Sequence, residues 1–180
     1  LTRSSAASDV YKRQAIDKIP MEMDQPCLRR LDSLLFGPGL GEDPLIWNHW
    51  ADRLRQFAGL LVLDADGLNA LASSAEGWRW LLRREGPTWL TPHLAEFRRL
   101  FPEIEIVDSL QAAIAAAGCS GCFVLLKGAH SAIADPDGLA VLLDGTSPEA
   151  ARTGLGDVLA GFAAGWSAVS VAAGVPLTLE

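Results

Sequence analysis

Short apolar runs, each followed at once by glycines or polar residues, constrain the fold of this chain more than any other feature. Leu60–Leu63 is entirely apolar and gives way to Asp64-Ala65-Asp66-Gly67, which is typical of a strand buried on both faces of a sheet. Cys122–Leu126 is a second such run, and Lys127-Gly128 follows it. Because a sheet buried on both faces needs helices to cover it, these runs predict an α/β fold.

Amphipathic segments alternate with the apolar runs. In residues 43–58, Ile46, Trp50, Leu54 and Phe57 recur at spacings of three and four, which predicts one face of a helix. The same reading predicts strands at 33–36, 88–90 and 103–107, helices at 76–84 and 156–174, a helix from Asp108 to Ala117 that ends at Gly118, a helix opening at Thr91-Pro92, and a hairpin of 131–134 with 139–143. This order predicts a mostly parallel sheet flanked by helices.

Charge, hydropathy and cysteine content narrow the class of protein. The 180 residues include 15 Lys and Arg against 22 Asp and Glu, a net charge of −7, which argues against nucleic-acid binding. No apolar run reaches the ~20 residues of a membrane span, so we expect no membrane partner. Cys27, Cys119 and Cys122 form no disulfide framework, which indicates a cytoplasmic protein.

The first residues differ from the rest of the chain. Residues 1–14 are polar and have no hydrophobic periodicity, and 4–14 resemble read-through of a cloning or sequencing adapter. We expect residues 1–25 to be a non-native or disordered leader, and residues 26–180 to form the domain.

Two glycine-rich segments are candidates for ligand binding, because ligands of such sheets bind at the carboxyl ends of the strands. Gly154-Leu155-Gly156 opens the last helix, where glycines allow close approach and backbone N–H groups favour an anion. Asp157 follows, and it either takes a proton in catalysis or only caps the helix. The loop Gly37–Gly41 follows another predicted strand, as a ligand loop or a plain turn.

Two further clusters follow predicted strands. His93 and Glu96 are three residues apart and share a helix face, where they either contact a substrate and a hydrated Mg²⁺ ion or form an ordinary solvated helix start. Lys127–Ser131 either contacts nucleotide phosphates or adenosine, or is the edge of a hairpin. Asp64 and Asp66, with Asn69, end a buried strand, so their carboxylates are further candidates for the site.

Taken in order, these motifs resemble the ADP/ATP-dependent NAD(P)H-hydrate dehydratase family, which has a ribokinase-like fold. The resemblance covers roughly residues 31–171. The motifs that carry it are Gly37-Pro38-Gly39-Leu40-Gly41, Val62-Leu63-Asp64-Ala65-Asp66-Gly67-Leu68-Asn69, Leu90-Thr91-Pro92-His93 with Glu96, Leu126-Lys127-Gly128-Ala129, and Gly154-Leu155-Gly156-Asp157-Val158-Leu159-Ala160-Gly161.

The resemblance implies a function in the repair of damaged nicotinamide cofactors. ADP or ATP, with Mg²⁺, phosphorylates the ring hydroxyl of the S-epimer of hydrated NADH or NADPH, and elimination of phosphate then restores the cofactor. Phosphate is a far better leaving group than hydroxide. The resemblance leaves open whether the chain forms a homo-oligomer, and whether an epimerase domain is fused to it or acts alongside it.

The resemblance also implies roles for individual residues. Asp157 would be the catalytic base and a substrate contact. Glu96 would help to organise Mg²⁺ through water. The other substrate contacts would be Gly39, Gly41 and His93, and the adenine nucleotide would be bound by Lys127, Gly128, Ala129, His130, Ser131, Gly154 and Gly156.

The sequence departs from the family pattern in several places. Thr153 stands where Gly or Ala is usual, Leu155 where Ser or Thr is usual, and Leu94-Ala95 replaces a Pro-Gly pair. The backbone N–H of Leu155 is retained, so we expect the anion hole to persist. The Gly- and Ala-rich stretch with which the family begins is absent, as is the part after the last helix, so 26–180 is expected to be a partial domain.

Two alternatives to the dehydratase remain open. The first is a small-molecule kinase of the same fold, of the vitamin or thiazole type, which would stop after phosphoryl transfer. The second is a nucleotide-binding fragment without activity.

Overall fold

The computed structural model describes residues 28–41, 43–143 and 154–175. The expected leader, residues 1–25, lies outside them. The helices are α3 (Pro44–Gln56), α4 (Ala65–Ser73), the 3₁₀ helix η1 (Gly77–Arg83), α5 (Leu94–Leu100), α6 (Ser109–Ser120) and α7 (Leu155–Ala172); the strands are β1 (Ser33–Phe36), β2 (Leu60–Leu63), β3 (Thr88–Leu90), β4 (Phe123–Leu126), β5 (Ser131–Ala134) and β6 (Ala140–Leu143).

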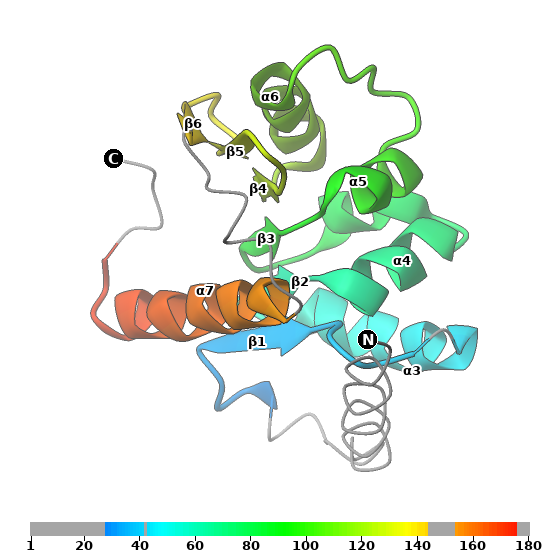
Figure 1. Ribbon diagram of the computed structural model, residues 1–180. Helices are drawn as coiled ribbons and strands as arrows, with labels where there is room; N and C mark the ends of the chain where they lie inside the picture. The colour runs from blue at the N-terminus through cyan, green and yellow to red at the C-terminus, as the bar shows by residue number, and fades with distance from the viewer. Residues whose placement is uncertain (1–27, 42, 144–153, 176–180) are drawn as a thin grey trace, which may run out of the picture.

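The strands form one six-stranded sheet in the order of the sequence (Figure 1). The first four are parallel, and β5 and β6 add an antiparallel hairpin at one edge. Leu35 pairs with Val62 and Val62 with Trp89, so equivalent positions of the first three strands lie in one row. The sheet and its helices confirm the predicted α/β class with a mostly parallel sheet.

The two faces of the sheet are covered very differently (Figure 1). Leu61, Leu63 and Leu90 belong to the large core beneath α3 to α6. Because side chains alternate along a strand, Leu60 and Val62 point to the other face, where they pack against Ala164 of α7. Helix α7 lies against β1 and β2, and its outer side exposes large apolar residues, namely Leu155, Val158, Leu159, Phe162, Trp166 and Val169.

Local signals explain most of the helix boundaries. Asp43 and Asp108 cap α3 and α6 by accepting backbone N–H groups of Leu45 and Gln111. Helix α6 continues past Gly118 and ends at Gly121, whose φ of +69° is the left-handed conformation that favours glycine. The prediction that this helix ends at Gly118 was therefore wrong by about one turn.

Three further expectations need correction. Residues 103–107 form no strand, because Ile104 and Ile106 pack against the core from an irregular connection that pairs with no neighbouring strand. The predicted helix at 76–84 is a 3₁₀ helix. Helix α4 was missed: Asp64-Ala65-Asp66-Gly67 was identified only as the polar end of a strand, whereas Asp64 is the residue before the first turn of α4.

One partly buried arginine stabilises the amino end of the sheet. The Arg84 guanidinium donates to the carbonyl oxygens of Leu54 and Phe57, at the end of α3, and of Gly59, just before β2. It also reaches the Pro87 carbonyl and the Thr88 hydroxyl, where β3 begins. Burial lowers the pKa of Arg84 from its ordinary value to about 10, so the group stays charged at neutral pH.

Candidate active site

A buried polar cluster lies at the carboxyl ends of β2, β3 and β4. Asp64, directly after β2, is only 1% exposed. Its Oδ1 accepts hydrogen bonds from the Thr91 hydroxyl at 2.9 Å and from the Lys127 Nζ at 2.7 Å. One carboxylate therefore holds the ends of three neighbouring strands together and fixes the lysine ammonium group.

The last helix begins beside this lysine. Lys127 Nζ lies 3.7 Å from the point that a Cβ on Gly156 would occupy, and Gly156 and Asp157 belong to the first turn of α7. Gly154, just before the helix, has a φ of +88°, a conformation that glycine adopts without strain. Free backbone N–H groups at a helix start and an ammonium group form a good environment for an anion. Asp157 is partly buried.

The Gly37–Gly41 loop packs closely against the start of α4. A Cβ on Gly37 would lie 1.7 Å from the Asp64 carbonyl oxygen, so no other residue fits there. The backbone N–H of Gly41 donates to Asp66 Oδ2 at 2.9 Å. Ala65, between the two aspartates, has a φ of +47°, which strains a residue with a Cβ. The loop and the helix start are therefore joined by close packing and a hydrogen bond.

His93 and Glu96 form a reciprocal cap at the start of α5. His93 Nδ1 accepts the backbone N–H groups of Ala95 and Glu96, and Glu96 Oε2 accepts the backbone N–H of His93 at 2.8 Å. Glu96 Oε1 lies 3.2 Å from His93 Nε2. This cap fixes a half-exposed imidazole beside the end of β4, since His93 and Lys127 form an isolated parallel bridge.

Both oxygens of Glu96 thus contact His93, and the residue is only 6% exposed. Within the described ranges, no group of three or more His, Cys, Asp or Glu side chains could hold a metal ion. Mg²⁺ in phosphoryl-transfer sites is held largely by phosphates and water, so the water-mediated role of Glu96 remains a prediction.

The segment after β4 turns sharply into β5. The Ser131 hydroxyl lies 3.0 Å from the Gly128 carbonyl oxygen and 3.2 Å from the Gly128 nitrogen, closing the turn. Ala129 and His130 are exposed at its tip. The predicted nucleotide segment is therefore joined to the site through Lys127, which the structure brings next to Gly156.

The structure brings together Lys127, Gly156 and Asp64. It places His93 just after β3, in a bridge with Lys127. The glycines of 37–41 adjoin Asp64 through α4. Thr91 was missed as a member of the cluster, although its position directly after a predicted strand is a usable signal.

In the part of the chain that the structure describes, no helix has both the length and the hydrophobicity to cross a bilayer.

The comparisons of this chain with known proteins all match one enzyme family. Residues 5–174 match the family model Carb_kinase, which is described as NAD(P)H-hydrate dehydratase. The bifunctional NAD(P)H-hydrate repair enzyme Nnr of Gloeobacter violaceus is 46% identical over 137 residues, which are 75% of this chain and 26% of the relative. The Nnr enzyme of Synechocystis is 43% identical over 140 residues, 77% of this chain and again 26% of the relative.

The fold is also similar to solved structures. The ADP/ATP-dependent NAD(P)H-hydrate dehydratase of Bacillus subtilis, co-crystallised with ATP and Mg²⁺ and soaked with CoA, is 28% identical with a TM-score of 0.60. The match covers 76% of this chain and 48% of that one. The chain thus spans about a quarter of the length of the curated relatives and about half of the Bacillus structure.

Proposed function

The chain belongs to the NAD(P)H-hydrate dehydratase family, and we propose that it carries out the ADP- or ATP-dependent dehydration of the S-epimer of hydrated NADH and NADPH. The observation that best supports this proposal is the position of Lys127. Its ammonium group lies beside the buried Asp64 and the first turn of α7, where this group and the backbone N–H groups of the helix start would contact a transferred phosphoryl group.

In the proposed reaction, Asp157 takes the proton from the ring hydroxyl, and the hydroxyl oxygen attacks the terminal phosphorus of the nucleotide. The bond from that phosphorus to the bridging oxygen breaks, and AMP leaves when the donor is ADP, or ADP when the donor is ATP. Lys127 and the N–H groups of Gly154–Gly156 stabilise the charge that develops on the phosphoryl oxygens. The C–O bond then breaks as the ring nitrogen donates its electron pair and phosphate departs. Loss of a proton from the neighbouring ring carbon restores the dihydronicotinamide.

The remaining predicted residues position the two substrates. Gly39, Gly41 and His93 would contact the hydrated cofactor, and Lys127 to Ser131 together with Gly156 would bind the adenine nucleotide. Mg²⁺, when bound, neutralises negative charge on the nucleotide phosphates. Glu96, at the base of α5, would orient the water molecules around that ion.

The test is a spectrophotometric assay for NADH recovery from its hydrate, with ADP and ATP compared and the Gloeobacter relative as positive control. Recovery of NADH with release of phosphate would support the proposal. A phosphorylated product that accumulates without NADH would replace it with the kinase. If calorimetry detects no binding at millimolar nucleotide, this chain is an inactive fragment.

The cellular setting is proposed on separate grounds. Within the described residues both cysteines, Cys119 and Cys122, are free thiols, which fits a reducing cytoplasm. The curated relatives are bifunctional by name, so we propose that an epimerase supplies the S-epimer, either fused to this domain or beside it. A homo-oligomer remains part of the proposal, and size-exclusion chromatography with light scattering would test it.

A further inference from the structure

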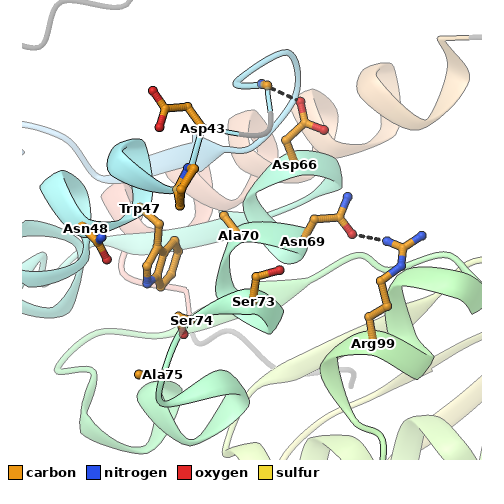
Figure 2. Close-up of a pocket in the computed structure, with 12 residues that line it drawn as sticks. Asp43, Trp47, Asn48, Asp66, Asn69, Ala70, Ser73, Ser74, Ala75 and Arg99 are labelled. Atoms are coloured by element: carbon orange, nitrogen blue, oxygen red, sulfur yellow. Dashed lines mark hydrogen bonds between the residues drawn. The ribbon is translucent and has the colours of Figure 1, made fainter.

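A cavity lies on the helical side of the Gly37–Gly41 loop (Figure 2). Its volume is about 650 Å³, which is within the range of small-molecule sites. Helices α3, α4 and α5 and the end of the loop surround it. Its walls include Gly41, Trp47, Asp66, Asn69, Ser73 and Arg99.

The cavity adjoins the candidate active site through two shared elements. Gly41 lines the cavity and is also a predicted substrate contact. Asp64 of the polar cluster and Asp66 of the cavity are two residues apart at the start of α4, and Asp66 accepts the Gly41 N–H. A ligand held at the glycine loop could therefore extend into this cavity.

The cavity offers groups that suit a ribose phosphate. Arg99 donates to the Asn69 side-chain oxygen (Figure 2), and in the described part of the chain it pairs with no carboxylate. A guanidinium left without an acidic partner is well suited to phosphate. Asp66 keeps an oxygen that can accept from a sugar hydroxyl, and Trp47 and Ala70 supply apolar surface.

We propose that this cavity binds the second, adenosine-bearing half of the hydrated dinucleotide, with Arg99 contacting one of its phosphates. The inference rests on the proposed function and deepens it. The nicotinamide ring would lie at Asp157, and the Gly37–Gly41 loop would separate the two halves of the substrate. Arg99 would then contribute to binding of the distal half but take no part in the reaction.

The test compares hydrated NADH, hydrated NADPH and hydrated nicotinamide mononucleotide, which lacks the second half, as substrates of the whole 180-residue chain. We expect Arg99→Ala to raise KM for the dinucleotides roughly tenfold or more with kcat unchanged, as for lost uniform binding. KM for the mononucleotide should not change. Equal increases for NADH and NADPH hydrates assign Arg99 to the diphosphate, and an increase for NADPH hydrate alone assigns it to the 2′-phosphate.

Arg98→Ala is the matched control, because Arg98 is exposed in the same last turn of α5 and does not line the cavity. Ser73→Phe, at an exposed position at the mouth of the cavity, should reproduce the Arg99→Ala effect by filling the space. Unchanged dinucleotide KM in Arg99→Ala, or an equal rise for the mononucleotide, would overturn the proposal.

A binding measurement keeps this proposal separate from the proposed function. Calorimetry with ADP-ribose, at saturating ADP, probes the distal half without any turnover. We expect binding to the unmodified chain and to Arg98→Ala, and at least tenfold weaker binding to Arg99→Ala. No binding of ADP-ribose, or equal binding to all three proteins, would reject the cavity whether or not the chain dehydrates its substrate.

Discussion

Arg84 and Lys127 lie at opposite ends of the same strands, β2 and β3. At the amino end, Arg84 donates to four backbone carbonyl oxygens and one hydroxyl. At the carboxyl end, Lys127 donates to Asp64, and its side chain is 21% exposed next to the first turn of α7. Both are cations at the rim of a hydrophobic sheet.

The difference lies in what remains free to bind. The fixed fork of a guanidinium matches several carbonyl oxygens at once, so Arg84 is saturated by the protein itself. An ammonium group has three N–H donors, and Lys127 uses one of them on Asp64 in the described structure. The amino end is thus a structural clamp, whereas the carboxyl end retains donors for a ligand.

The largest effect is expected for the stability of the chain when Arg84 is replaced. Arg84→Met leaves the partly buried carbonyl oxygens of Leu54, Phe57 and Gly59 without this donor, and we expect the free energy of unfolding to fall by about 4 kcal/mol. Urea denaturation measures it. Arg83→Met is the control, since that side chain is largely exposed and pairs with Glu76, and its loss should cost less than about 1 kcal/mol. Equal decreases in the free energy of unfolding of the two variants would contradict a stabilising role of Arg84 at the amino end of the sheet.

The next effect concerns the chemistry at the opposite end. Asp157→Asn should lower turnover roughly 10²-fold or more, as expected for a lost general base, and leave ADP affinity nearly unchanged. Initial rates of NADH recovery, with calorimetry of ADP, provide the measurement. Asp137→Asn, in the exposed β5–β6 turn, should have full activity. If Asp157→Asn has full activity too, Asp157 is not the base.

A smaller effect is expected for the lysine itself. Lys127→Met should weaken ADP binding about tenfold, because one charge-assisted contact is lost. The comparison is made in an Asp64→Asn background, so that no buried carboxylate is left unpaired and stability is matched. Calorimetry of ADP on the single and double variants gives the ratio. Equal affinities would mean that Lys127 serves only to neutralise Asp64.

The last prediction concerns the reactivity of the Cys122 thiol, which lies at the amino end of β4. Burial raises the pKa of Cys122 from 9.0 to about 12, so its thiolate fraction at pH 8 is roughly 10³-fold below that of an ordinary cysteine. We expect iodoacetamide to leave Cys122 unmodified in the native chain and to modify it faster in Arg84→Met. Peptide mass spectrometry reads the site, with half-buried Cys119 as internal control. Rapid native labelling of Cys122 would contradict the burial.

Much of this fold could be predicted from local patterns. Leu60–Leu63 and Cys122–Leu126 were identified as strands because a run without polar residues can only be buried, and the turn at Asp135–Gly138 was identified by its residue types. The predictions failed where packing overrode the pattern. Helix α4 was not predicted, and within it a Cβ on Gly67 would lie 2.5 Å from the Phe36 carbonyl oxygen, so this glycine serves close packing against the preceding strand.

The sequence by itself determined which chemical groups follow each strand: aspartates after β2, a threonine and histidine after β3, and a lysine after β4. Only the tertiary structure decided that Asp64, Thr91 and Lys127 share one hydrogen-bonded cluster, and that Arg99 lines a cavity beside Gly41. The physical reason is how far apart the interacting residues lie in the sequence. Burial and turn formation depend on neighbours along the chain, whereas these contacts join residues 27 to 63 positions apart, through strand register and helix packing.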